Sequence, residues 1–456
     1  MAIFQLQAKD AVIRLNAFNA LNSLQSFSWD SALNAENLSQ LGSSSYEAQT
    51  ITPEVSAQFE SRATGSLAAV LSRMIYTVNA STGEFVGPLG TANSALIRET
   101  DLERAVFDLI EAKKANEVFD RATLIHRAHL KSFSFSIKTD GHANETYSVE
   151  SDMLEVFRKP FHDLIVLPVT RNVTTPTVAV DVPVDHTVQA TAVVAAADWQ
   201  IYALDIDGTR VPSSDLTVVN GAVKGTNADV VTISGASATA GVTIPLGSKL
   251  GLIMYRKTPG AFPVVEYPTT ARFVKADQAD IFLVSPTATF TVAGHTDTIE
   301  NLLTLYSVDL NTIPFTAAQQ LLRVQSLDGT CDLRRQALKE IKKNTRGNAI
   351  FYRGATYPLN ITSQLSVLES DLNEWATLQA KNAYGSATPD ILNLADFENQ
   401  TWVIVARYYK TGTTVQTIAL LDQRTENPGH KISVGGRAEM TYSFAGSKIA
   451  VQGVVV

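Results

Sequence analysis

Alternation of apolar and polar positions dominates the first and last thirds of the chain. In the segment 132–137, serine alternates with Phe133, Phe135 and Ile137. In the segment 402–408, the even-numbered positions are all apolar, namely Trp402, Ile404, Ala406 and Tyr408. A period of two places successive side chains on opposite faces of a β-sheet. Both segments are therefore predicted to be strands with one face on a core and one face in water.

One segment shows a helical period instead. Thr100 and Glu103 have the spacing of a capping box, in which the Thr hydroxyl accepts from a backbone amide and the Glu side chain reaches back. The apolar residues that follow share one helical face, namely Leu102, Ala105, Val106, Leu109 and Ile110. We predict an amphipathic helix over about residues 101–121.

The middle of the chain, residues 168–275, is rich in β-branched residues and turn residues and poor in long charged side chains. Asp207-Gly208 and Asn220-Gly221 are typical hairpin-turn dipeptides. Apolar runs predict strands at 216–219, 242–246 and 250–255, and prolines mark both junctions. We predict an all-β insert of immunoglobulin-like size, without the cysteine pair of that family.

Three weak matches, in the same order and each displaced by about 300 residues, link the two outer regions. They join 21–30 to 321–330 on Gln-Ser (25–26 and 325–326), 52–71 to 357–378, and 143–151 to 437–446 on Thr-Tyr-Ser. The second match includes two helix starts, Ser66-Leu67 and Asp371-Leu372. Either the chain is duplicated, or polar-alternating strands simply resemble one another in composition.

We favour duplication and predict an α+β, mainly β fold. It would contain two related antiparallel β-sheet or barrel units, each with a helix. The first unit, with an N-terminal arm, would occupy residues 1–167, the all-β insert 168–275, and the second unit 276–456.

Composition narrows the function classes. The 456 residues suggest about two to four domains. A single cysteine, Cys331, excludes a disulfide framework or a Cys-based zinc finger. A net charge of −8 argues against a protein that coats DNA. No run approaches the roughly 20 apolar residues of a membrane span, and the N-terminal segment lacks a secretory pattern, so we expect a soluble protein made in a cytoplasm.

The sequence offers no strong catalytic motif. It has no phosphate-binding loop, dinucleotide fingerprint, nucleophile elbow or H-E-x-x-H helix. His126 and His129 lack a third metal ligand at suitable spacing, and we expect them on a surface or interface. Asp205 and Asp207 begin a calcium-loop-like string that lacks the later ligands, so a hairpin turn is favoured. We predict no catalytic, cofactor-binding or metal-binding residues, no cofactor and no enzyme activity. Cys331 and all four tryptophans are expected in the core.

Segments 26–60, 131–157 and 430–451 resemble the tail tube proteins of long-tailed bacteriophages. The first looks like their polar-alternating inner strands, and the other two look like their closing strand pair. The resemblance covers most of 20–157 and 320–456 and is one of pattern. It implies a structural virion protein, assembled in the host cytoplasm, whose rings of six sheets stack into a hollow tube that conducts DNA during ejection. Its partners would be itself and the sheath, terminator or baseplate proteins.

Two ring arrangements are open. Three chains with two units each would give pseudo-sixfold symmetry, which we favour, or six chains would form the ring. The insert would project outward. A lumen that passes DNA should lack cationic contacts, because these bind phosphate. Five carboxylates near the first strands are candidates for the lumen, with solvated surface as the alternative: Asp30, Glu36, Glu47, Glu54 and Glu60.

The segment Leu333–Arg346 is strongly basic. It carries Arg334, Arg335, Lys339, Lys342, Lys343 and Arg346, with a possible buried stripe at Ala337, Leu338 and Ile341. Nucleic-acid binding is one interpretation. We favour an interface helix or loop that pairs with an acidic surface on the adjacent ring.

Other functions remain open at this point. A baseplate hub or tail-completion protein of the same fold would differ from a tube subunit in copy number. A β-rich surface-binding adhesin would need an export route, and a virion glycan hydrolase would need convergent carboxylates.

Overall fold

The computed structural model describes residues 11–15, 18–20, 24–38, 48–61, 67–78, 85–88, 96–115, 118–139, 144–158, 161, 163–167, 177–183, 199–206, 209–211, 217–223, 228–234, 251–256, 278–317, 319–344, 347–368, 401–431 and 439–454. Strands make up most of this part of the chain, so the prediction of a mainly β fold is confirmed. The helices within it are α1 (Leu67–Met74) and α2 (Ile299–Thr304), with short 3-10 turns at Glu99–Arg104 and Leu310–Thr312.

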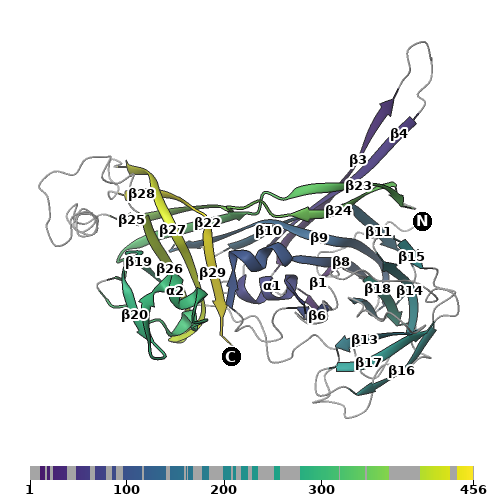
Figure 1. Ribbon diagram of the computed structural model, residues 1–456, viewed down its shortest axis with the longest axis horizontal. Coiled ribbons are helices and arrows are strands. Elements are labelled where there is room, and N and C mark those ends of the chain that lie inside the picture. Colours follow the sequence, from purple (N-terminus) through teal and green to yellow (C-terminus); the bar gives the residue numbers. More distant parts are fainter. Residues whose placement is uncertain are drawn as a thin grey trace, which may run out of the picture.

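A large antiparallel sheet of 16 strands forms the body of the molecule (Figure 1). Its main path runs in the order β19-β26-β27-β28-β25-β22-β9-β10-β4-β3. These strands are β3 (Leu24–Leu38), β4 (Ala48–Ser61), β9 (Val118–Lys138), β10 (Asn144–Ser151), β19 (Gln278–Val284), β22 (Val324–Asp332), β25 (Asn360–Leu368), β26 (Thr401–Lys410), β27 (Thr413–Lys431) and β28 (Glu439–Gly446). Six more strands branch from the path: β1 (Ala11–Leu15), β2 (Phe18–Ala20), β7 (Leu96–Arg98), β8 (Val106–Ala115), β11 (Met153–Phe157) and β29 (Lys448–Gly453).

The same run of strands occurs twice in this sheet. In the first run, the pairing order is β1-β8-β9-β10-β4-β3, and β11 also pairs with β9. In the second run, the order is β19-β26-β27-β28-β25-β22, and β29 also pairs with β27. The two runs are joined because β22, the last strand of the second run, pairs with residues 132–138 of β9, beyond the part of β9 that pairs with β8.

The pairing register repeats as closely as the strand order. Phe107 of β8 pairs with Ala128 of β9, and Trp402 of β26 pairs with Gln423 of β27, so both partners are displaced by 295 positions. Each pair is followed at once by a break in register. A β-bulge is a defined feature of a strand pair, and similar composition alone does not place it at the same displacement.

Backbone conformation also matches between the runs. Arg127 has φ 49° and Asp422 has φ 51°, and these residues too lie 295 positions apart. Such left-handed values are uncommon for residues other than glycine. Further bulges precede Ser26 in the β3–β4 pair and Ser326 in the β22–β25 pair. Their displacement of 300 positions is that of the Gln-Ser match in the sequence.

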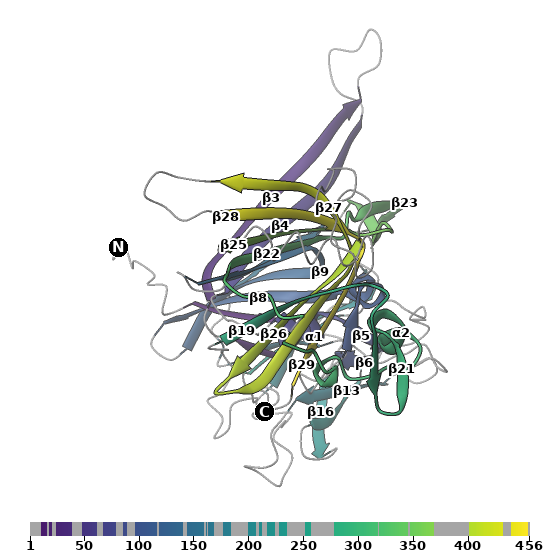
Figure 2. The same cartoon turned by 90° about the vertical axis from the view of Figure 1, so that its left-hand side faces the viewer.

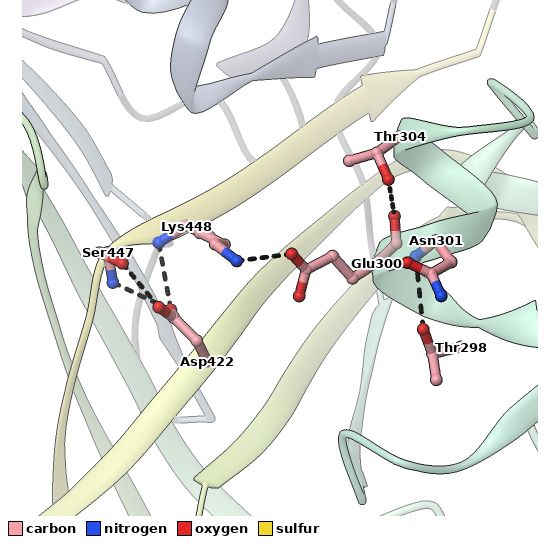
Figure 3. Close-up of polar contacts among 7 residues, drawn as sticks. All are labelled: Thr298, Glu300, Asn301, Thr304, Asp422, Ser447 and Lys448. Carbon is pink, nitrogen blue, oxygen red and sulfur yellow. Dashed lines mark hydrogen bonds and ion pairs between the residues drawn. The ribbon is translucent and has the colours of Figure 1, made fainter.

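Asp422 also fixes the turn from β28 to β29 (Figure 3). Its carboxylate accepts hydrogen bonds from the amide (2.9 Å) and hydroxyl (2.6 Å) of Ser447 and from the amide of Lys448 (3.2 Å). The Lys448 ammonium lies 2.5 Å from the Glu300 carboxylate of α2, and this hydrogen bond raises the pKa of Lys448. Both side chains of the pair are exposed, so its contribution to stability is small.

A continuous hydrophobic core spans the joint between the two runs. It includes Phe59 and Tyr147 of the first run and Leu365 and Tyr442 of the second, and the whole of α1 is buried. A second cluster packs α2 against β26 and β27. Strand β26 is therefore buried on both faces over Trp402–Ala406, so the prediction that one of its faces lies in water is wrong. Packing of the second cluster explains the apolar residues at its odd as well as its even positions.

Helix α1 begins against a buried carboxylate. The Leu67 amide donates to Glu145 at 3.2 Å, and the Tyr147 hydroxyl donates to the same carboxylate at 2.9 Å. The Ala68 amide donates to Gln416 of β27 at 2.8 Å. These acceptors satisfy helix N-terminal amides that have no partner within the helix, and the negative charge suits the positive end of the helix dipole. Because Glu145 and Gln416 belong to different runs, α1 ties the two together.

The helix predicted over 101–121 is wrong. A 3-10 turn at Glu99–Arg104 is followed by β8, which pairs with β9 and β1 on its two sides. Leu109 and Ile110 are both fully buried although they are adjacent. A strand buried on both faces loses its period of two, and the resulting pattern resembled a helical one. At the start of the turn, Asp101 rather than Glu103 accepts the hydrogen bond, from the Arg98 amide at 3.0 Å.

The segment predicted as an all-β insert forms two small antiparallel sheets. One has four strands, β12 (Asp163–Leu167), β18 (Gly251–Arg256), β14 (Trp199–Ile206) and β15 (Thr209–Val211). The other has three, β13 (Thr177–Pro183), β17 (Ala228–Ser234) and β16 (Thr217–Val223). Strand β12 precedes the predicted boundary at 168 and yet pairs with β18.

The two predicted hairpin turns in this region have different outcomes. Asp207-Gly208 lies outside the described residues, and the strands on its two sides, β14 and β15, pair antiparallel with Ile206 opposite Thr209. Asn220-Gly221 instead lies inside β16, at a break in its register with β17. The predicted strand at 250–255 corresponds to β18, and the helix start at Ser66-Leu67 corresponds to α1. The predicted strand at 242–246 and the helix start at Asp371-Leu372 lie outside the described residues.

Three two-stranded sheets complete the fold. They are β5 (Tyr76–Val78) with β6 (Phe85–Pro88), β20 (Thr289–Val292) with β21 (His295–Thr298), and β23 (Gln336–Asn344) with β24 (Gly347–Gly354). In both views the β23–β24 hairpin lies above β9, whereas α1 and the strands β13 and β16 lie below it (Figures 1 and 2). The insert is thus on the side of the large sheet that α1 covers.

Candidate conduit surface

Strand β4 shows how the sheet separates its two faces. Val55, Ala57 and Phe59 are buried in the core, whereas Ser56 and Gln58 between them are exposed. The alternation continues through β10 and the second half of β9, where buried aromatic residues alternate with half-buried serine and threonine. One face of each strand therefore contacts the core, and the other faces water.

Register aligns these polar positions into rows that cross several strands. One row runs from β3 to β25 through paired residues and crosses the joint between β9 and β22: Ser26, Glu60, Thr146, Ser134, Thr330 and Thr362. Parallel rows contain Ser28, Gln58, Ser148, Ser132, Asp332 and Asn360, and then Asn144, Ser136, Asp328, Gln364 and Ser443. All of these side chains are exposed or half-buried. We call this surface the polar sheet face.

Charge on the polar sheet face is mainly negative. Among the side chains that the structure describes, its carboxylates are Asp30, Glu54, Glu60, Asp328, Asp332 and Glu439. Its cations are Lys138, opposite Ser326, and Arg424, opposite Ala445. Most positions are neutral serine, threonine, asparagine or glutamine. Such a surface offers a polyanion few cationic contacts.

The five carboxylates predicted for a lumen are only partly described. Asp30 and Glu54 are exposed and Glu60 is half-buried, and all three belong to the polar sheet face. Glu36 lies in β3, but its side chain is outside the described part, and Glu47 is outside it altogether.

One end of the polar sheet face is covered by the chain itself. Arg353 of β24 lies 3.2 Å from Glu150 of β10, and both side chains are almost completely buried. Glu150 continues the alternation of Thr146 and Ser148, so β24 crosses the polar side of the sheet there. A buried ion pair is costly to break, because either partner alone leaves an uncompensated charge.

The basic segment 333–346 is neither a helix nor a loop, because residues 336–344 form β23 of the β23–β24 hairpin. Arg335, just before β23, donates to the backbone carbonyls of Leu130 (2.5 Å), Arg353 (2.6 Å) and Leu102 (2.9 Å). This guanidinium holds the hairpin to the sheet and is not presented to a ligand. The side chains at 337–346 are outside the described part, so the interface and nucleic-acid interpretations of the other basic residues stay predictions.

The structure also places the histidine pair that the sequence offered as candidate metal ligands. His126 and His129 lie in β9 and are buried, so their predicted surface position is wrong. His126 Nε2 lies 3.4 Å from the Glu155 carboxylate. Within the described residues, no three histidine, cysteine or acidic side chains are arranged to hold a metal ion.

Some of the residues predicted for the core are buried, and one is exposed. Cys331 and Trp402 are buried as expected, and burial raises the pKa of the Cys331 thiol. Trp29 is 39% exposed, so the prediction that it anchors the core is wrong. Its indole donates to Glu111 at 3.3 Å.

Among the residues that the structure describes, no helix is long and apolar enough to cross a membrane. No protein-family model matches the chain, and no curated protein shows significant similarity to it.

Proposed function

We propose that this chain is a tail tube subunit of a long-tailed bacteriophage, whose rings stack into a conduit for the genome. The observation that carries the proposal is the polar sheet face. It continues from one strand run into the other across the β9–β22 joint, is rich in hydroxyl and amide side chains, and has more carboxylates than cations among its described side chains. Its opposite face is covered by a hydrophobic core and α1.

The two strand runs support a duplicated tube-like unit. Their common strand order, bulges and left-handed residues are economically explained by one ancestral unit copied within the chain. An open sheet leaves unpaired edges, and closing repeated sheets into a ring removes them. Cyclic symmetry is the common way for identical chains to close such a structure.

The chemistry of the face suits transport rather than binding. DNA carries a phosphate charge about every 1.7 Å of its axis, and each cationic contact adds affinity by releasing counterions. A wall of neutral dipoles and carboxylates solvates the passing polymer and its ions without holding it. We infer a structural role without catalysis or cofactor.

The ring would contain three chains in a pseudo-sixfold arrangement, because each chain already supplies two joined units. A ring of six chains is the alternative. The insert would be an immunoglobulin-like sandwich in this proposal. The β23–β24 hairpin crosses the polar side of the sheet, and the insert lies on the opposite side, so it would project outward from the ring (Figures 1 and 2). Partners would be further copies and the sheath, terminator or baseplate proteins of a virion.

Electron microscopy of the purified full-length chain tests the class directly. Hollow stacked rings are the expected result, and a stable monomer at high concentration without any assembly would overturn the proposal. Abundance in the virion separates a tube subunit from a hub, since a hub is present in one ring only.

A charge substitution tests the lumen. Ser134→Lys with Thr330→Lys places two cations on the polar sheet face of each chain, whereas Thr289→Lys on β20 adds an exposed cation elsewhere. Tubes of the double variant should retain short double-stranded DNA at low salt, and tubes of the wild type and of Thr289→Lys should not. Equal retention by the Thr289→Lys tubes would show that the polar sheet face does not line the bore.

A further inference from the structure

The joint between the two strand runs shows how one unit accepts the next. β22 pairs with β9 over seven residue pairs, from Ser326 with Lys138 to Asp332 with Ser132. Beyond the two ends, the Leu333 amide donates to the Lys131 carbonyl at 2.9 Å, and the Thr139 amide donates to the Gln325 carbonyl at 3.0 Å. Odd-numbered residues of β9 therefore form the hydrogen-bonded pairs, and even-numbered residues form the non-hydrogen-bonded pairs.

Both strands of this joint have counterparts elsewhere in the chain. The counterpart of β22 is β3, which ends the main path of the sheet and pairs with β4 alone among the described strands. The counterpart of the second half of β9 is the end of β27, where residues 427–431 pair with β28 on one side. The described strands leave the other side of 427–431 unpaired. Each chain thus carries both halves of a second joint, at opposite ends of its sheet.

We propose that β3 of one copy pairs with β27 of the next copy, in the register of the internal joint. This inference rests on the proposed ring-forming function and specifies its subunit contact. Residues of β22 lie 300 positions after their counterparts in β3, and residues of β27 lie 295 positions after their counterparts in β9. Applying these two offsets to the internal pairing predicts Ser28 opposite Lys431, Asp30 opposite Gly429 and Ala32 opposite Asn427. In this register the rows of the polar sheet face continue from one chain into the next.

Trp29 supports a second copy of this chain as the partner of the β3 edge. At the internal joint, Gly329 faces the ring of Phe135, and a Cβ on Gly329 would lie 2.4 Å from that ring. At the second joint the same two positions are Trp29 and His430, so the large side chain is now on the β3 side. An exposed tryptophan beside an unpaired strand edge is typical of a protein interface, and the neighbouring copy would cover it.

Pro428 makes this edge selective. It occupies the position of Phe133, whose backbone faces β22 at the internal joint. A proline there has no amide to donate, so the ladder between copies lacks one hydrogen bond. Proline is tolerated on edge strands and discourages pairing with unrelated strands. The remaining contacts, including Trp29, then select the correct partner.

Disulfide trapping tests the register. Ser28→Cys with Lys431→Cys forms a predicted non-hydrogen-bonded pair, in which Cβ atoms are close enough to bridge. The matched control keeps Ser28→Cys but moves the second cysteine to position 430, because adjacent residues of a strand belong to opposite faces of the sheet. Cys331 is buried, and its raised thiol pKa disfavours the reactive thiolate, so the background is low. Asp328→Cys with Ser136→Cys is a positive control that should bridge within one chain.

The expected result is a ladder of covalent oligomers on a non-reducing gel for the first variant only, and the last rung gives the number of chains in the ring. Equal ladders with the His430 control, or hollow tubes without a ladder, would overturn the strand pairing while the tube function stands. A ladder from assemblies without a bore would instead retain the pairing and overturn the tube.

A second variant tests the contact without engineered cysteines. Trp29→Ala should raise the concentration needed for assembly about tenfold or more, as expected for a buried aromatic anchor. Leu305→Ala removes a side chain that is 68% exposed at the C-terminal end of α2, and it should leave assembly unchanged. An unchanged assembly concentration for Trp29→Ala would place the subunit contact elsewhere.

Discussion

Gly329 reports on the packing at the joint between the two strand runs. It lies in β22 opposite Phe135 of β9, and a Cβ added to it would be 2.4 Å from one ring carbon and 2.6 Å from another. Phe135 is buried, so its ring has little room to move away. The Gly329→Ala substitution therefore forces the ring or the strand to shift.

The expected change in the free energy of unfolding for Gly329→Ala is the sum of two opposing effects. Overpacking a well-packed core costs about 1–3 kcal/mol. Alanine in a strand is favoured over glycine by about 0.5–1 kcal/mol, because glycine loses more backbone entropy on folding. Gly329→Ala should therefore destabilise the chain by about 0.5–2 kcal/mol. With Phe135→Ala in place, the ring is absent, and the same substitution should stabilise by about 0.5–1 kcal/mol.

This change of sign is the test. Urea unfolding of the unassembled chain, followed by far-ultraviolet circular dichroism at a concentration below assembly, gives the four midpoints of the double-mutant cycle. Phe135→Ala alone should cost about 3–5 kcal/mol. If Gly329→Ala stabilises the chain in both backgrounds, Phe135 does not pack on Gly329, and the described joint is wrong.

Four other predictions test contacts elsewhere in the chain. Arg353→Met should cost about 3–5 kcal/mol in urea unfolding because it leaves Glu150 buried and unpaired, and adding Glu150→Gln should recover part of that loss. Glu145→Ala should lower stability by about 1–2 kcal/mol, since it removes the acceptor at the start of α1, and a neutral result would exclude this cap. Asp422→Ala should be less stable than Asp422→Gly by about 1 kcal/mol, because only glycine adopts its positive φ freely. Burial raises the pKa of Glu99 above its usual 4.5, so its favourable contribution is complete below that pH and is lost as pH rises through the folded-state pKa; Glu99→Gln should abolish that part of the pH dependence in thermal unfolding.

The sequence predicted both the existence and the facing of strands that have one face in the core and the other exposed to solvent. In the segment 132–137 the serines lie on the polar sheet face and the apolar residues lie in the core, so burial itself imposes the period of two. The helix expected over 101–121 failed for the opposite reason. β8 is covered on both faces around Leu109 and Ile110, and its partners lie in distant segments. A local pattern does not contain that information.

The repeated run of strands was indicated by three weak sequence matches, but its strongest signs are geometric. Arg127 and Asp422 share a left-handed backbone although their side chains have opposite charge, so residue identity hides the correspondence. The exposure of Trp29 was also beyond the sequence, because it depends on which strand ends the sheet. Asn220-Gly221 shows the same limit, since a dipeptide that permits a turn also permits a bulge.

In the proposed ring, the two strand runs on one chain would affect how the subunits assemble. In a ring of identical single units, every joint must form between separate molecules, and each must use the same residues. Two units on one chain divide this task. The internal joint forms at the high effective concentration that a covalent link provides. It therefore does not have to discriminate against unrelated chains. It uses the close Gly329–Phe135 packing. On the pairing proposed here, the joint between chains must select its partner from solution, and its residues differ accordingly. Pro428 reduces the affinity of the edge for unrelated strands. Trp29 adds a contact that only the matching copy buries. Making the second joint like the first, by Pro428→Phe with Trp29→Gly, should therefore give more off-pathway aggregation and not better tubes.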